Sequence, residues 1–583
     1  MAEQILSPGV FQNESDQSLV SQGIQGTATA IVGPTVLGQP YVPTYVTSYS
    51  EYASKFGETF KSGSYYYEYF TSMAARDFFQ NGGQTLLVTR IISDSGSTSV
   101  STYASASVNA FGYVPNTPLT SSFQLETLSW GDVMNNTSSL STGGALPSGS
   151  GKNVRWEVTQ VSPTLGTFTL AIRQGDDNVS QPNYLETWPN LSLDPAQPNF
   201  ISRVIGDIKP VYRVDVDGSP YIDYTGSYAN ASQYVRVKSV TTPQIDSIDN
   251  SGAYKAAQYS GSLPATGSGS FGGSFAGGLV ATTNEQLMNE AITATNIQGF
   301  SGANYTAAFN LLANKDDYRF NVLLAPGVSF DTTGNALSIM ISTAEGRGDA
   351  IALVDTKKYG AVVSTAATAA AGQNSNYAAT YWPWVQLYSS GLGKAVWAPP
   401  TTVMGGVLAF NDQVGAEWFA PAGLNRGGVP SVLKAERKLT QNDRDTLYNA
   451  NVNPLATFPG NGVVVFGQKT LQKKSTALDR VNVRRLLIAL KDFIGQVGNN
   501  LVFEQNTAVT RNRFLSQVNP YLDSVVQRQG LYAYKVVMDE SNNTPDVIDR
   551  NQLVGQIYIQ PTKTAEFIIL NFNVLPTGAT FPA

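Results

Sequence analysis

The sequence lacks two residue types altogether: its 583 residues include neither histidine nor cysteine. Histidine is the commonest general base, and cysteine supplies thiol nucleophiles, zinc ligands and every disulfide. What remains is chemistry by carboxylate pairs, Ser/Lys dyads or oxygen-ligated metals, and the 43 Asp and Glu residues show no spacing that singles out such a group. We therefore expect a protein that is not an enzyme, with no catalytic residue, no cofactor and no metal site.

Charged residues are also scarce, at 14% of the chain against ~25% in typical soluble domains. The net charge of −6 is uneven, because residues 431–583 hold 17 Lys and Arg against 12 Asp and Glu. That segment therefore carries +5 and the rest of the chain −11. A basic excess this small, without Arg and Lys clusters interleaved with aromatics, is a weak signal for nucleic acid, and an acidic protein partner explains it equally well.

Long apolar runs are missing too. No stretch approaches the ~20 apolar residues that span a bilayer, and residues 1–16 lack the basic and apolar regions of a signal peptide. We expect no membrane insertion. A chain of this length predicts two to four domains, and its 42% hydrophobic residues suffice for their cores.

The first segments of the chain indicate an α/β layer that is interrupted. Residues 1–20 show no helical or strand periodicity, and an apolar strand follows at 27–33. Ser48 and Glu51 have the spacing of a capping box, and a second helix and a strand at 86–88 come next. From 95 to 151 the only charged residues are Glu126 and Asp132, in a Ser/Thr/Gly/Asn-rich sequence that indicates an insertion.

The insertion is expected to be β-rich and to end in a flexible linker. Short alternating strands are predicted at 154–158, 167–172 and 234–237, and a Gly/Ser-rich run fills 260–278. Apolar strands at 320–325 and 350–355 then indicate that the α/β layer resumes.

The last quarter of the chain combines helices with strands. Thr440 and Asp443 predict a capped helix, and apolar stripes predict two more helices at 483–497 and 514–526. Strands follow at 531–538 and 553–560. The final strand alternates the apolar Leu570, Phe572 and Val574 with asparagines, which gives it one apolar and one polar face.

Three short motifs have simpler explanations than ligand binding. Residues 267–272 fit the dinucleotide fingerprint, but they lie in the Gly/Ser run and open no helix. Residues 149–152 resemble part of a phosphate loop, but Leu146 stands where the first glycine belongs and Asn153 replaces the Ser or Thr that would hold magnesium. Trp382 and Trp384 are expected to be buried anchors rather than a carbohydrate platform.

A series of short sequence motifs, in order along about two thirds of the chain, resembles that of the major sheath protein of contractile phage tails and related injection machines. No such motifs occur within residues 93–285. The motifs lie at residues 7–10, 31–33, 46–48, 56–57, 78–83, 88–91, 323–327, 398–400, 405–407, 418–423, 453–454, 458–460, 464–471, 483–485, 502–506 and 565–568. Lys469 stands where the family often has arginine, so we do not assign it that arginine's contacts.

The resemblance implies a structural role in a virion. Subunits of the family form six-fold rings stacked helically around an inner tail tube, and the sheath shortens from a metastable extended state to drive that tube through the host envelope without nucleotide hydrolysis. The expected partners are further copies of the chain, the tube protein, and the baseplate and tail terminator proteins, with no nucleic acid. Assembly in the host cytoplasm is expected.

The expected fold class is a multidomain α+β protein. A middle α/β domain (23–92 and 286–430) is interrupted by an outward-facing all-β insertion (93–285), and a C-terminal α/β assembly domain spans 431–555. Residues 1–22 and 556–583 are expected to be linking arms. The resemblance implies that these arms are exchanged as strands between neighbouring subunits.

Candidate contact residues follow from these expectations. The linking residues are expected to be Val10, Phe11, Phe567, Leu570, Phe572 and Val574. Arg484 and Arg485, beside the apolar stripe of their helix, are candidates to face an acidic tube, although a solvated or ion-paired position is the simpler interpretation. The alternative function is a β-rich virion or secreted adhesin that binds glycans.

Overall fold

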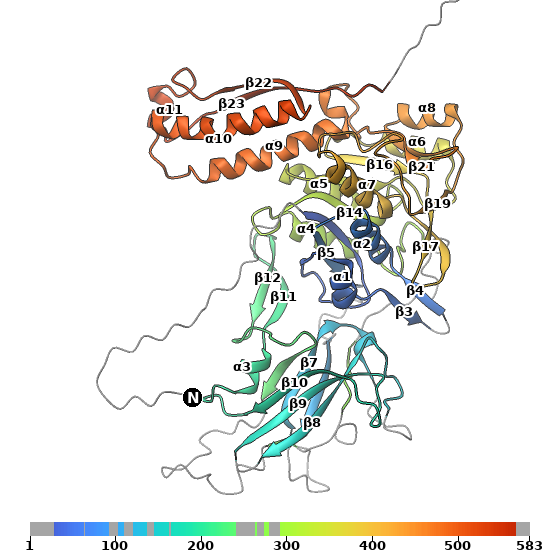
Figure 1. The fold of residues 1–583 in the computed structure, drawn as a ribbon, viewed down its shortest axis with the longest axis vertical. Coiled ribbons are helices and arrows are strands. Elements are labelled where there is room, and N and C mark those ends of the chain that lie inside the picture. Colours follow the sequence, from blue (N-terminus) through green and yellow to red (C-terminus); the bar gives the residue numbers. More distant parts are fainter. Residues whose placement is uncertain are drawn as a thin grey trace, which may run out of the picture.

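An eight-stranded, mostly parallel sheet lies at the centre of the molecule (Figure 1). The computed structural model describes residues 28–62, 65–92, 103–109, 121–136, 145–162, 165–240, 263–264, 273–278 and 292–566. The sheet has the order β2-β5-β1-β14-β15-β16-β20-β21. Its strands are β1 (Ala28–Pro34), β2 (Thr44–Val46), β5 (Leu86–Ile91), β14 (Phe320–Ser329), β15 (Ile351–Asp355), β16 (Ala378–Trp382), β20 (Val452–Phe458) and β21 (Gly462–Val465).

The strand order shows that segments distant in sequence share this sheet. β1 pairs in parallel with β5 on one side and with β14 on the other. The predicted resumption of the α/β layer after the insertion is therefore seen in the pairing of β1 with β14. The sheet also takes in β20 and β21, so it continues beyond residue 430, where we placed the start of a separate C-terminal domain.

Helices cover both faces of the sheet, because its strands are apolar on both sides. One core joins α4, α5, α6 and α8 to alternate strand residues such as Val32 and Leu323, and a second joins α1, α2 and α7 to the intervening residues such as Ile31 and Val322. These helices are α1 (Tyr49–Phe56), α2 (Phe70–Gln80), α4 (Gly302–Leu312), α5 (Ala336–Arg347), α6 (Val363–Ala371), α7 (Thr401–Val414) and α8 (Gln441–Asn449).

Two predicted helix starts are confirmed by their caps. Ser48 accepts a hydrogen bond from the Glu51 backbone N–H at the start of α1. Thr440 and Asp443 form the complete capping box of α8, in which each side chain accepts from the other residue's backbone. The sequence therefore located both helix N-termini through local chemistry alone.

The described part of residues 93–285 packs as two small sheets and a hairpin at the lower end of the molecule (Figure 1). The rings of Phe123 and Phe168 stack between the two sheets, with centroids 5.4 Å apart. The strands are β6 (Tyr103–Asn109), β7 (Ser121–Trp130), β8 (Val154–Ser162), β9 (Thr167–Gln174), β10 (Tyr184–Leu191), β11 (Lys209–Val214), β12 (Pro220–Thr225) and β13 (Val235–Val240). The region also contains the short helices η1 (Asp132–Met134) and α3 (Ile201–Ile205), which an all-β insertion would lack.

Two small sheets flank the central one, and a separate layer lies at the upper end. The small sheets consist of β3 (Thr59–Ser62) with β4 (Tyr65–Glu68), and of β17 (Val385–Ser389) with β18 (Lys394–Ala398) and β19 (Val432–Ala435). The upper layer, which we call the C-terminal layer, contains α9 (Val481–Asn499), α10 (Ala508–Gln527), β22 (Leu531–Val537), α11 (Pro545–Asp549) and β23 (Gln556–Pro561), with η4 (Ala477–Asp479) leading into it.

Candidate subunit-linking site

The C-terminal layer has a hydrophobic core of its own. Leu486 and Leu490 of α9 pack with Val518 and Leu522 of α10, and the two strands cover this helix pair. Pro520 lies inside α10, and the helix continues past it to Gln527. The layer is therefore a small cooperative unit mounted on the central sheet.

The pair of strands in this layer is open at both edges. β22 and β23 are antiparallel, and among the residues that the structure describes neither pairs with a third strand. Tyr532 and Tyr558 on these strands are 66% and 56% exposed. An edge with unpaired backbone groups next to apolar side chains is the feature that strand addition uses.

Close to this layer, Glu566 is held by side chains from three separate segments. Arg480 donates from Nε to Oε1 (2.7 Å) and from Nη2 to Oε2 (2.9 Å), and Tyr448 of α8 donates its hydroxyl to Oε2 (2.6 Å). Gln468 Nε2 donates both to Glu566 Oε1 (3.1 Å) and to Thr564 Oγ1 (2.6 Å). We call Tyr448, Gln468, Arg480 and Glu566 the carboxylate clamp. The clamp fixes the chain where it leaves β23.

The electrostatics of the clamp keep the Glu566 carboxylate ionised. Partial burial acts to raise the pKa of Glu566, but hydrogen bonds from Arg480, Tyr448 and Gln468 outweigh it and hold the pKa below its ordinary value. Burial and the hydrogen bond to Glu566 in turn raise the pKa of Tyr448. Lys469 lies alongside, with Nζ 4.1 Å from the Tyr448 ring centroid and donating to the Tyr448 carbonyl oxygen (2.8 Å).

The structure places Arg484 and Arg485 inside the subunit, where each contacts the middle of the chain. Both are only 2% exposed. Arg484 donates to the Asn376 carbonyl oxygen (3.0 Å), and its guanidinium lies 3.9 Å from the ring centroid of Tyr377. Arg485 makes two hydrogen bonds with Asp412, at 2.8 and 2.6 Å. Arg485 is therefore ion-paired within the subunit, as the simpler interpretation of the sequence expected. Contact of Arg484 or Arg485 with a tube stays a prediction.

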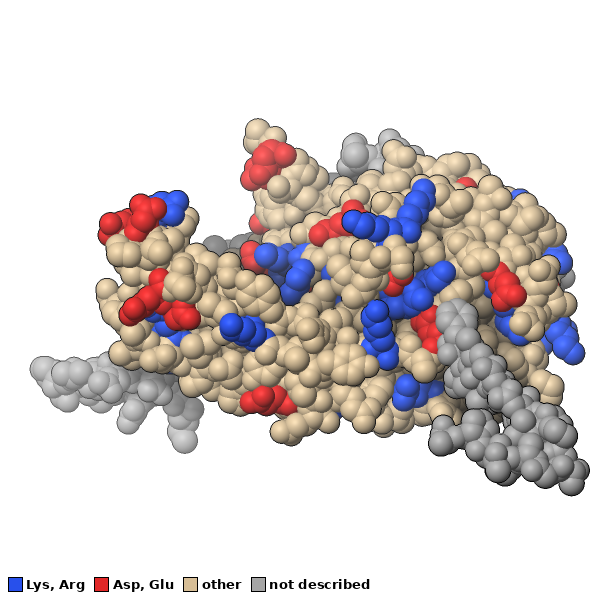
Figure 2. Space-filling model, turned by 90° about the horizontal axis from the view of Figure 1, so that it is seen from above, with Lys and Arg blue, Asp and Glu red and all other residues tan. Residues whose placement is uncertain are grey.

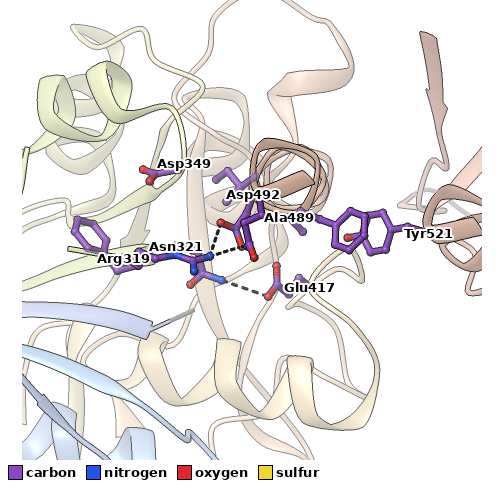
Figure 3. Close-up of a pocket in the computed structure, with 11 residues that line it drawn as sticks. Arg319, Asn321, Asp349, Glu417, Ala489, Asp492 and Tyr521 are labelled. Carbon is purple, nitrogen blue, oxygen red and sulfur yellow. Dashed lines mark hydrogen bonds and ion pairs between the residues drawn. The ribbon is translucent and has the colours of Figure 1, made fainter. Parts of the chain in front are cut away.

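A polar cleft of about 230 Å³ separates α9 from β14, and it is bridged at two points (Figure 3). Arg319 donates to both oxygens of Asp492 (2.8 and 3.1 Å), and Asn321 donates to Glu417 (3.3 Å). Burial raises the pKa of Glu417, although Arg485 partly opposes this effect. The Arg319–Asp492 and Arg485–Asp412 pairs join the C-terminal layer to β14 and α7, whereas the Asn321–Glu417 bond lies within the central part of the subunit.

The predicted linking residues Val10, Phe11, Phe567, Leu570, Phe572 and Val574 lie outside the described residues, as does the dinucleotide-like motif at 267–272. The clamp was not foreseen. Two of its members, Gln468 and Glu566, lie in sequence motifs that carry the family resemblance. Their contacts could not be predicted, because the contacting residues are far apart in the sequence.

Other predicted features have structural explanations. Trp382 and Trp384 are fully buried, so they offer no carbohydrate platform and the glycan-binding alternative loses its main support. Ser150 and Asn153 hold the turn at 149–152 by bonding each other's backbone N–H groups. No described helix is long and apolar enough to cross a membrane, and the described residues contain no group of three or more acidic side chains placed to hold a metal ion.

Comparison with known proteins identifies the two segments around the clamp. Residues 298–471 match the phage tail sheath protein central domain, and residues 473–575 match the phage tail sheath C-terminal domain. Residues 298–575 belong to the phage tail sheath family. The sheath domains therefore include the second part of the central sheet, the carboxylate clamp and the C-terminal layer.

Curated sheath proteins and solved sheath structures agree with this assignment. The tail sheath proteins of Vibrio phage KVP40 and Enterobacteria phage T4 are 40% and 41% identical over 185 residues, which is 32% of this chain. The match spans only 28% of the length of either relative. The sheath tail protein of Listeria innocua shares the fold with a TM-score of 0.52 and 10% identity, over 92% of this chain and 96% of that one.

Proposed function

We propose that this chain is the structural subunit of a contractile tail sheath. Its copies form six-fold rings stacked helically around an inner tail tube, and the sheath contracts to drive the tube through a host envelope without nucleotide hydrolysis. The match of residues 298–575 to the two tail sheath domains carries this proposal. The chain works in the virion, after assembly in the host cytoplasm, with tube, baseplate and tail terminator proteins as partners.

The open strand pair of the C-terminal layer supports a specific way of linking the subunits. Of the predicted arm 556–583, residues 556–561 form β23 within the subunit, and the linking strand is the part after the clamp. Residues 1–22 and 567–583 of neighbouring copies add as strands to the free edges of β22 and β23. Val10 and Phe11 of one arm, and Phe567, Leu570, Phe572 and Val574 of the other, supply the apolar contacts. If each arm adds about five backbone hydrogen bonds at roughly 1 kcal/mol net apiece, the linkage is worth several kcal/mol per arm.

Contraction without fuel requires two assembled states that differ in free energy. The extended sheath is metastable, and the contracted sheath buries more surface between subunits. Strand linkages keep each subunit attached to its neighbours while weaker domain contacts exchange. The basic C-terminal segment is the part expected to face an acidic tube.

Electron microscopy of the purified full-length chain tests the proposed function directly. Regular hollow tubes or stacked rings are the expected result, and a chain that stays monomeric at every concentration would overturn the proposal. Soluble glycan-binding monomers would instead favour the adhesin alternative.

Paired substitutions in the arms test the linkage separately. Val10→Ser with Phe11→Ser, or Phe572→Ser alone, should stop tube growth and leave the subunit folded by circular dichroism. The matched controls are Ser15→Ala with Gln17→Ala in the first arm and Asn571→Ser on the polar face of the last strand, and these should assemble normally. Normal tubes from the Val10/Phe11 and Phe572 variants would contradict strand linkage while leaving the sheath function intact.

A further inference from the structure

The turn between α9 and α10 presents large apolar side chains to solvent. Phe503 is fully exposed, and Val502 and Val509 beside it are also exposed. We call these three residues the apolar knob. Phe503 has a φ of +67°, a left-handed value that is uncommon for residues other than glycine. An exposed aromatic side chain in an uncommon backbone conformation is typical of a contact surface.

The knob is held in a fixed turn. The Glu504 backbone N–H donates to the Leu501 carbonyl oxygen (3.1 Å), and Thr510 Oγ1 donates to the Gln505 carbonyl oxygen (2.6 Å). Asn506 Nδ2 donates to the Gln552 carbonyl oxygen (2.8 Å), which ties the turn to the segment after α11. The side chains are therefore presented at little entropic cost, as a preorganised contact requires.

The end of the C-terminal layer that carries the knob is acidic. Figure 2 shows acidic side chains gathered at the left end of the upper face, where Figure 1 places α11. The exposed acidic residues of the knob turn, of α11 and of the loop before it are Glu504, Asp539, Glu540, Asp546 and Asp549. Basic residues also lie at this end: Arg550 pairs with Asp546, and Lys535 and Arg511 interact electrostatically with Asp539.

The opposite end, around α8, has complementary features. A groove of about 390 Å³ lies beside the carboxylate clamp and is lined both by apolar residues, among them Pro454 and the exposed Phe466, and by Arg444, Asp445 and the clamp residues Tyr448, Gln468 and Glu566. Asn451, just after α8, donates from Nδ2 to the Gln472 carbonyl oxygen (3.1 Å). This bond holds the loop that carries Lys473 and Lys474 next to α8. The exposed or partly exposed basic residues of this end are Lys438, Arg444, Lys473, Lys474 and Lys563.

We propose that the apolar knob of one subunit docks in the α8 groove of a neighbouring copy of this chain. Phe503 enters beside Phe466 and Arg444, and the acidic end of the first subunit faces the basic end of the second. The two surfaces differ, since the knob lies on the C-terminal layer and the groove lies around α8 and the clamp, so the contact is head-to-tail and repeats into a ring or helix. This proposal rests on the sheath function, and it adds to the strand linkage a second, side-chain-mediated contact.

Charge reversal with second-site rescue tests the contact. Glu504→Lys with Asp549→Lys removes the negative excess of the acidic end, and Lys473→Glu with Lys474→Glu removes most of the positive excess of the basic end. Each double variant alone should raise the critical concentration for tube assembly at least about tenfold at low salt, because the attraction between the two ends is then lost. Higher salt should shrink the difference, since these charges are exposed.

Mixing the two variants gives a result that a folding defect cannot produce. In an equimolar mixture the introduced lysines of one variant face the introduced glutamates of the other, and unchanged ends face each other at the next contact, so tubes of alternating subunits should form. The fourfold variant carrying all the reversals should assemble alone. Asp176→Lys with Asp316→Lys, which changes the same charge at exposed positions elsewhere, is the matched control and should assemble as the wild type does.

Phe503→Ser tests the knob itself, because a fully exposed side chain can be replaced without disturbing a core. The variant should stay folded and assemble at least about tenfold more weakly, in line with the loss of one buried aromatic anchor. Wild-type assembly by the reversed variants, or failure of their mixture to assemble, would overturn the proposed contact. A wild-type chain that never assembles would instead overturn the sheath function on which it rests.

Discussion

The Arg480 guanidinium and the Glu566 carboxylate form a two-point ion pair across 86 positions of the chain, with distances of 2.7 and 2.9 Å. Arg480 is the N-cap of α9, and Glu566 follows β23. The pair therefore joins the start of the C-terminal layer to the point where the chain leaves it. A mechanical force applied to the chain beyond Glu566 would be transmitted through this ion pair to α9.

The clamp makes assembly sensitive to substitution and to acid. Glu566→Gln should weaken tube assembly and also lower the melting temperature of the isolated subunit, because it removes the ion pair with Arg480. Because the folded pKa of Glu566 lies below the ordinary value of 4.5, its contribution is present above that pH and is lost as the pH falls through the folded pKa. Assembly followed by light scattering between pH 7 and pH 3 should show a wild-type loss at the acidic end that Glu566→Gln lacks. Asp316→Asn, at an exposed position away from both proposed contact surfaces, is the control.

The Arg485–Asp412 pair predicts a stability effect rather than a tube-binding effect. Arg485→Met should lower the free energy of unfolding by about 2–4 kcal/mol, because it leaves Asp412 and the buried Glu417 without their cation. Urea denaturation measures this change, and Lys491→Met on the exposed side of α9 should change it little. Reversal of Arg484 and Arg485 to Glu therefore reports on tube binding only if the variant is first shown to fold. An unchanged unfolding midpoint for Arg485→Met would contradict the structural role.

Asp77 should give the protein a stability that falls with rising pH. Burial raises the pKa of Asp77 from 3.8 to about 7, although hydrogen bonds from Ser431 and Asn81 partly oppose the shift. Between these values the folded state binds a proton that the unfolded state has released, so stability decreases as the pH rises. Asp77→Asn should remove this slope, a difference of about 2 kcal/mol between pH 5 and pH 7 in urea titrations. Asp176→Asn, at an exposed site, should leave the slope in place, and a wild-type stability that is flat over this range would refute the assignment.

Two glycines on different helices should respond oppositely to alanine. A Cβ at Gly406 of α7 would lie 2.2 Å from Asp77 Oδ2 and 2.9 Å from its backbone oxygen, because α7 packs directly on α2. Gly406→Ala should therefore destabilise the subunit by about 1–3 kcal/mol. A Cβ at Gly495 of α9 meets nothing within 4 Å, so Gly495→Ala should stabilise by up to about 1 kcal/mol. Thermal unfolding of the two variants measures both signs, and equal effects would contradict the close α2–α7 approach.

Local patterns in the sequence determined much of this protein by themselves. The caps at Ser48 and Thr440 act over three residues, and the apolar runs of β14 and β15 require burial whatever surrounds them. The strands predicted at 531–538 and 553–560 are found at 531–537 and 556–561. The sequence motifs within residues 298–575 identified the family, because each motif is short and can be recognised without knowing the fold.

Only the tertiary structure decided which distant residues meet. Arg484 and Arg485 stand on the helix predicted for them, but their partners Tyr377 and Asp412 are set by how α9 crosses the central sheet. The extension of that sheet into β20 and β21 depends on pairing between strands far apart in sequence. The clamp on Glu566 gathers three segments in the same way. Such contacts depend on the packing of whole elements, which no local pattern of residues specifies.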